Sequence, residues 1–158
     1  MVGVVKAVRA PVSPAWLRAV VGAAATVPEI AARLPANEWE AVVKISGDRE
    51  LRRLNQRFLA EDRVTDVLSF PTGEASPGSH VGDIVVSWPA VLRQGREFRH
   101  GSLNELGLLV VHGFLHLLGW DHRSGVEERE MNRLTREALA RAGIRIAAAR
   151  LLSPDQGG

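Results

Sequence analysis

The stretch SLNELGLLVVHGFLHLLGWDH, residues 102–122, is the most informative part of this chain of 158 residues. Ser102, with Glu105 three positions later, matches a capping box, and the residues that follow are almost all apolar. This pattern predicts a helix over residues 103–118. Gly119 then supplies the residue type that commonly ends a helix.

Two histidines four residues apart, His112 and His116, project from one face of that helix, so both imidazoles can reach a single metal ion. A helix that ends at Gly119 lets the chain turn back and bring His122 to the same point. Three neutral nitrogen ligands with an open fourth position are typical of catalytic zinc. We therefore predict one Zn²⁺ per chain on these three histidines, with Asp121 accepting the spare N–H of a ligand and fixing its tautomer.

Each of these residues also has a purely structural interpretation. A single histidine on an apolar helix is more often a core side chain satisfied by hydrogen bonds, and Asp121 can be a simple turn residue. Two buried histidines with a third beyond a glycine need partners, and one metal ion satisfies all three. Zinc proteases carry H-E-x-x-H, but Gly113 follows His112, so the carboxylate that activates water for peptide attack is missing.

Outward from residues 102–122, β-prone and helical segments alternate along the chain. The β-prone segments are residues 2–8, 40–46, 65–70 and 81–88, and further helices begin at Pro14, Asp48, Pro89 and Ser124. This alternation predicts an α/β fold. We expect a single α/β metal-hydrolase domain over residues 1–150, with a small mixed sheet of about four strands packed with about five helices, mostly on one face. Residues 151–158 are expected to form a frayed tail.

The composition excludes several classes of protein. Cysteine is absent, which excludes disulfides and a disulfide-bonded partner, thiolate zinc sites, iron–sulfur clusters and a cysteine nucleophile. The longest uncharged stretch, residues 106–120, is shorter than the roughly 20 residues that span a bilayer, and the N-terminus lacks a signal-peptide pattern. We therefore expect a cytoplasmic protein that does not associate with membranes.

The basic residues are nearly all arginine, since only Lys6 and Lys44 are lysines among 20 basic residues and the net charge is +2. Arginine suits bidentate recognition of phosphate, so an anionic partner is permitted. A high-GC coding bias accounts for the arginine content equally well. The remaining histidines, His80 and His100, stand apart from other ligand-type residues, and we expect both at the surface.

The histidine stretch resembles the signature of a known family. HGFLHLLGWDH, residues 112–122, is similar to the pattern H-G-x-L-H-L-x-G-x-D-H of the YbeY family, metal-dependent bacterial endoribonucleases linked to rRNA maturation and ribosome quality control. The likeness continues in Leu54-Asn55, TDVLSFP (65–71), GDI (82–84) and Glu128 with Met131, and spans about residues 40–142. The resemblance implies the same three zinc ligands, His112, His116 and His122, and an RNA substrate.

One departure from the family pattern concerns an arginine. The family carries an arginine implicated in activity a few residues before the T-D-V-L-S-F-P strand, and Leu59 occupies that position here. Arg57 and Arg63 are close in sequence, and either of them, with backbone near Thr65, is expected to bind substrate phosphate. A solvated helix face is an equally good interpretation of each arginine.

These observations predict a zinc-dependent endoribonuclease for single-stranded RNA, acting on rRNA or the ribosome. Three neutral ligands leave zinc its full charge, which attracts a phosphodiester and lowers the pKa of bound water toward about 7. Metal-bound hydroxide is therefore the expected nucleophile, with the RNA 2′-hydroxyl as an alternative. Two other hypotheses are a ribosome-associated RNA-binding assembly factor with a mainly structural zinc, and a metal-dependent hydrolase of peptides or small esters. The sequence makes no prediction of the oligomeric state.

Overall fold

The fold is that of a computed structural model, which describes residues 1–36, 38–59, 66–72, 80–121 and 124–151. Its strands are β1 (Val2–Lys6), β2 (Glu40–Ser46), β3 (Val67–Pro71) and β4 (His80–Ser87). Its helices are α1 (Pro14–Ala24), α2 (Pro28–Ala31), α3 (Asp48–Leu59), α4 (Trp88–Glu97), α5 (Ser102–Leu117) and α6 (Gly125–Arg141), followed by the 3₁₀ helix η1 (Ala148–Leu151). The predicted α/β class is confirmed.

The four strands form one mixed sheet in the order β1-β2-β4-β3. β1, β2 and β4 are parallel, and β3 runs antiparallel to β4 at the edge of the sheet. In β2 the side chains of Ala41, Val43 and Ile45 are fully buried and alternate with partly exposed residues, because successive side chains point to opposite faces. Val2, Ala41 and Gly82 stand in one row across the amino ends of the three parallel strands.

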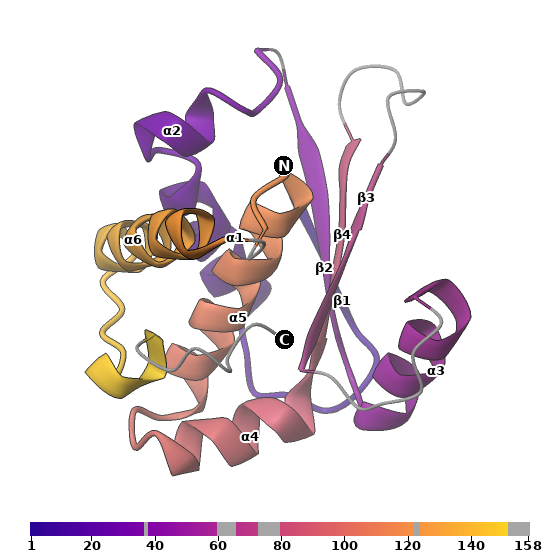
Figure 1. Ribbon diagram of the computed structural model, residues 1–158. Coiled ribbons are helices and arrows are strands. Elements are labelled where there is room, and N and C mark those ends of the chain that lie inside the picture. The colour runs from indigo at the N-terminus through magenta and orange to yellow at the C-terminus, as the bar shows by residue number, and fades with distance from the viewer. Residues whose placement is uncertain (37, 60–65, 73–79, 122–123, 152–158) are drawn as a thin grey trace.

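Helices cover the two faces of the sheet unequally (Figure 1). α1, α5 and α6 pack together on one side, here called the near face, where α5 lies against β3 and β4. The opposite side, the far face, carries α3, which packs on β3 and β4 around Leu51, Leu68 and Val85. The prediction of helices mostly on one face is confirmed, with α3 as the exception.

Serine side chains begin two of the predicted helices. Ser13 Oγ accepts a hydrogen bond from the backbone N–H of Trp16 at 3.3 Å and starts α1. Ser124 Oγ accepts from the backbone N–H of Glu127 at 3.2 Å and starts α6. Both hydroxyls satisfy an N–H group that the helix itself leaves unpaired, as expected for N-caps.

The start of α5 differs from the prediction. Ser102 is the first residue of the helix, and the N-cap is Gly101 at φ 84°, with no side-chain cap bond. A Cβ on Gly95 of α4 would come within 2.9 Å of the Gly101 backbone, so the two helices meet through glycines. Glu105 does not cap the helix because its buried carboxylate accepts hydrogen bonds from Arg150. The predicted capping box is therefore wrong.

The last described residue belongs to η1. Leu151, which the sequence placed in the tail, accepts a hydrogen bond on its carbonyl from Asn132 Nδ2 at 3.1 Å, and residues 152–158 lie outside the described residues. Throughout the described part of the chain, no helix combines the length and the apolar character needed to cross a membrane.

Candidate metal centre

α5 brings two of the three predicted zinc ligands together. His112 and His116 lie one turn apart near the carboxyl end of the helix, and both are half-buried. Their Nε2 atoms are 3.0 Å apart, and their rings meet at 71° with centroids separated by 4.6 Å. The two imidazoles therefore present one nitrogen each to the same point in space.

This geometry fits a single zinc ion. Zinc–nitrogen bonds of about 2.0–2.1 Å at a tetrahedral angle separate two ligand nitrogens by about 3.3 Å, close to the 3.0 Å between these two. His122 lies outside the described residues and stays a prediction. Within the residues that are described, no three His, Cys, Asp or Glu side chains gather into a metal site.

Gly113, the residue directly after His112, has no room for a side chain. A Cβ on Gly113 would lie 2.8 Å from Ile84 Cγ2 and 3.2 Å from both Ser69 Oγ and Val67 Cγ2. The Ser69 hydroxyl donates to the Gly113 carbonyl at 2.9 Å and ties the helix to β3. The glutamate of H-E-x-x-H is therefore excluded here by the packing of α5 on the sheet as well as by the sequence.

Gly119 ends α5 as predicted. It has φ 99°, and its N–H donates to His116 O at 3.1 Å, while the N–H of Trp120 donates to Leu115 O at 3.1 Å. This pair of bonds is a Schellman motif, which needs a residue in the left-handed conformation at the glycine position. The helix thus stops within one turn of the second histidine.

The turn after α5 is held from two sides. Arg33 donates from Nη1 to Leu118 O at 3.1 Å, and its guanidinium carbon lies 3.6 Å from the centroid of the Trp120 ring. Trp120 Nε1 in turn donates to Glu130 Oε1 of α6 at 3.1 Å. The buried Trp120 ring fixes the direction in which the chain leaves the helix toward the half-buried Asp121. The role of Asp121 as acceptor of a ligand N–H stays a prediction.

The predicted phosphate-binding residues lie on other parts of the chain. Arg57 is exposed in the last turn of α3, on the far face of the sheet from α5 (Figure 1). Arg63 and Thr65 lie outside the described residues. The structure therefore groups His112 with His116 and places Arg57 on a separate helix.

The two remaining histidines differ from each other. His80, with a side chain 30% exposed, lies at the surface as predicted, between Glu40 and Asp83. The prediction for His100 is wrong, because its side chain is only 6% exposed. Its Nδ1 accepts a hydrogen bond from the backbone N–H of Ala147 at 2.9 Å, so Nε2 carries the proton and donates to Glu105 Oε1 at 2.7 Å.

A buried polar network, which the sequence did not indicate, surrounds that histidine. Arg150 donates to both oxygens of Glu105, from Nη2 at 2.9 Å and from Nε at 3.2 Å. Gln94 accepts from Arg150 at 3.3 Å and donates to Asp66 at 3.4 Å. Burial raises the pKa of Asp66 and outweighs the hydrogen bond from Gln94. Its hydrogen bonds join residues up to 56 positions apart, so no local sequence pattern predicts the network.

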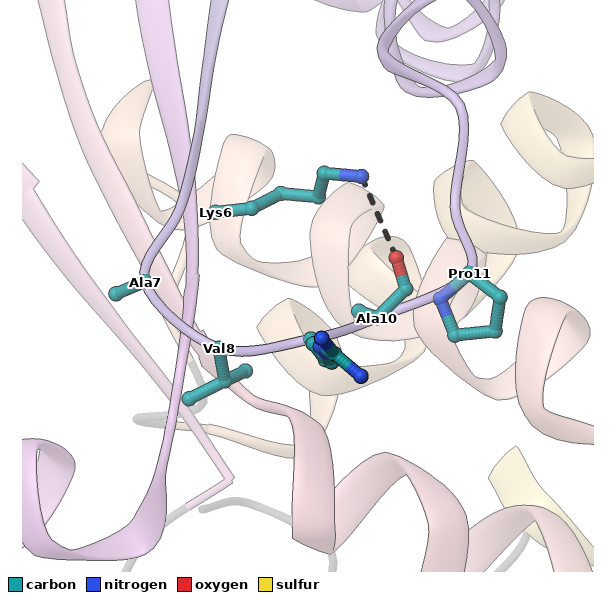
Figure 2. A pocket seen from close by; sticks show the side chains of 6 residues that line it. Lys6, Ala7, Val8, Ala10 and Pro11 are labelled. Atoms are coloured by element: carbon teal, nitrogen blue, oxygen red, sulfur yellow. Dashed lines mark hydrogen bonds between the residues drawn. The ribbon is translucent and has the colours of Figure 1, made fainter.

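A cavity of about 700 Å³ is separate from this centre. Figure 2 shows its lining, which runs from Lys6 to Pro11 after β1, with the Lys6 ammonium donating to Ala10 O at 3.4 Å. Lys6 also donates to Val12 O at 3.2 Å. It stands at the carboxyl ends of the parallel strands, whereas Gly82, at their amino ends, is the residue that meets Leu117 of α5. The lysine closes a loop and does not face the histidines.

Comparison with known proteins shows which family this chain resembles along most of its length. The family model described as Endoribonuclease YbeY matches residues 12–143. A relative named Endoribonuclease YbeY from Aquifex aeolicus is 42% identical over 114 residues, covering 69% of this chain and 76% of the relative. One of the same name from Picosynechococcus is 39% identical over 129 residues, covering 76% and 78%. A Thermotoga maritima protein solved in solution shares the fold, with a TM-score of 0.58 and 24% identity over 100% of this chain and 99% of that one.

Proposed function

This chain belongs to the YbeY endoribonuclease family, and on that premise we propose that it is a zinc-dependent endoribonuclease that cleaves single-stranded RNA. An endoribonuclease role follows from the family itself. The finer proposal is that the substrate is rRNA, that cleavage serves rRNA processing and ribosome quality control, and that the protein acts in the cytoplasm.

The observation that carries the metal-dependent part is the 3.0 Å approach of the two Nε2 atoms of His112 and His116. When bound, zinc supplies a Lewis acid for the phosphodiester and activates water as the nucleophile. The chain's contribution is to aim both imidazoles at one point, with His122 as the third ligand and Asp121 orienting a ligand ring. Because these ligands carry no charge, the centre stays positive and attracts a phosphate.

The packing of Gly113 argues against the competing hypothesis of peptide hydrolysis. Metalloproteases of the H-E-x-x-H type need a carboxylate at this position. Here the position faces Ile84 at a distance that leaves no space for even a methyl group. Phosphodiester hydrolysis needs no general base at residue 113 if the metal itself activates water.

The test compares His112→Ala and His116→Ala with His80→Ala, a matched control at a surface histidine. Wild type and the control should each hold about one zinc per chain and cleave a single-stranded RNA, because three imidazoles complete the site. The two α5 variants should lose zinc and cleave at background level. Full cleavage by a zinc-free α5 variant would contradict the proposal, and zinc-loaded wild type that binds rRNA without cutting it would favour the assembly-factor alternative.

The substrate-binding arginine is tested with Arg57→Ala and Arg63→Ala. We propose that one of the two replaces the arginine lost at Leu59, so that variant should raise the KM for RNA while its zinc content stays normal. Leu59→Arg should compensate for the loss. If neither alanine variant changes cleavage, both arginines belong to a solvated surface.

A further inference from the structure

α3 carries an arginine stripe, defined as Arg49, Arg53 and Arg57, spaced four residues apart on one side of the helix. All three are exposed, and Arg52 is exposed beside them. The opposite side of α3 is apolar and packs on the far face through Leu51. With a rise of about 1.5 Å per residue, the stripe extends for about 12 Å along the helix.

The acidic residues of α3 do not pair with Arg49 or Arg53 of this stripe. Asp48 accepts hydrogen bonds from Arg93 at 3.0 Å and from Ser87 at 2.5 Å, and Glu50 pairs with Lys44 at 2.6 Å. Both carboxylates are thus engaged by other elements at the start of the helix. Arg49 and Arg53 have no ion-pair or hydrogen-bond partner for their side chains among the described residues.

Like charges four positions apart destabilise a helix slightly, so the arginine stripe by itself is unfavourable for the stability of α3. α6 is also rich in arginine, but there acidic side chains offset the repulsion. There Glu137 pairs with both Arg133 and Arg141 at a spacing of four, and Arg133 also bonds Glu29. The kind of repulsion that α6 offsets is left in place between Arg49 and Arg53 on α3.

We propose that the arginine stripe of α3 binds the phosphate backbone of the RNA substrate away from the cleaved bond, an inference that rests on the proposed endoribonuclease function. Arginine forks match phosphate oxygens in pairs and need no base sequence. α3 and α5 pack on opposite sides of β3, which is the edge strand. A single strand that leaves the histidines over this edge reaches the stripe, so long substrates gain contacts that short ones cannot make.

The test is the double variant Arg49→Ala/Arg53→Ala, made in a His116→Ala background for binding and in wild type for cleavage. Its control is Arg136→Ala/Arg145→Ala, which removes two exposed arginines, one within α6 and one beyond its end. Each phosphate contact on a single strand contributes about 0.7 to the slope of log K against log salt. The stripe variant should therefore lose about 1.4 from that slope and bind a 20-nucleotide strand about 25-fold more weakly at about 0.1 M salt. The control should behave like its parent.

Two further measurements separate the possible failures. Arg49→Lys/Arg53→Lys should keep the salt slope, and an unchanged melting temperature shows that each variant folds. Cleavage of a long strand should drop in the stripe variant, while cleavage of a strand of a few nucleotides should not. Equal salt slopes for stripe and control variants would overturn the proposal even if the histidine variants abolish cleavage. If the stripe variant loses the expected salt slope but wild type cleaves no RNA, the proposed endoribonuclease function is rejected and the stripe remains an RNA-binding surface.

Discussion

The near and far faces of the sheet are built in different ways. On the near face, α1, α5 and α6 bury one continuous apolar cluster, which includes Phe114 and Leu115 between the two histidines. On the far face, α3 covers a small cluster of Leu51, Leu68 and Val85 and leaves its arginines in water. The two histidines therefore stand on the densely packed near face, which can hold their geometry fixed, whereas the arginines of α3 stand on the thinly covered far face.

The largest expected difference between the faces comes from core truncation. Phe114→Ala should lower the unfolding free energy by about 3–5 kcal/mol, because a fully buried aromatic ring is removed from dense packing. Leu51→Ala should cost about 2 kcal/mol, since its small cluster can collapse. Urea denaturation measures both, and only Phe114→Ala should also reduce zinc content. Equal costs would show that the far-face cluster is as tightly packed as the main core.

Ion pairs should show the same contrast. Glu105→Gln removes the carboxylate 2.9 Å from the buried Arg150 and should cost about 3 kcal/mol, whereas Glu50→Gln breaks the partly exposed pair with Lys44 and should cost less than about 1 kcal/mol. Adding Arg150→Met to Glu105→Gln should recover part of the loss, because the buried cation that lost this ion pair is then gone. No recovery in chemical denaturation would mean that the hydrogen bond from Arg150 to Gln94 and the one from His100 to residue 105 dominate.

Methyl additions probe the close contact of α5 with the sheet. Gly113→Ala should cost about 1–3 kcal/mol and disturb zinc binding, because its Cβ would meet Ile84 at 2.8 Å. Gly22→Ala in α1 is the control, since no atom lies within 4 Å of its Cβ, and it should stabilise the protein by up to about 1 kcal/mol. Thermal melts with zinc analysis give both results. A tolerated Gly113→Ala would contradict the tight packing described for this helix.

The smallest effects concern pH. Burial raises the pKa of Asp66, so the folded state binds more protons than the unfolded chain and stability falls as pH rises above about 4. Asp66→Asn should therefore gain stability relative to wild type between pH 4 and 7. For Asp48, hydrogen bonds from Arg93 and Ser87 outweigh the opposing effect of burial and lower the pKa, so wild type should lose stability relative to Asp48→Asn as pH falls below about 4. Unfolding curves across pH 2.5–7 should give slopes of opposite sign.

Much of the fold could be predicted because its signals are local. The alternation in EAVVKIS identifies β2 with both of its ends, and the serine before Pro14 identifies the start of α1. Ser102 with Glu105 satisfies the same kind of local rule, but the capping box that it predicts is not formed, because the Glu105 carboxylate accepts hydrogen bonds from Arg150 and His100. The sequence contains no sign of those partners, since they approach from distant segments.

The sequence by itself determined the α/β order, the placement of His112 and His116 on one helix face, and the end of that helix at Gly119. These features depend on the helical period and on the backbone freedom of glycine, which act between near neighbours. Only the tertiary structure decided that residue 113 meets the sheet without space for a side chain, that His100 is buried, and that α3 holds its arginines on the far face. Those outcomes depend on which surfaces meet once separate segments pack together.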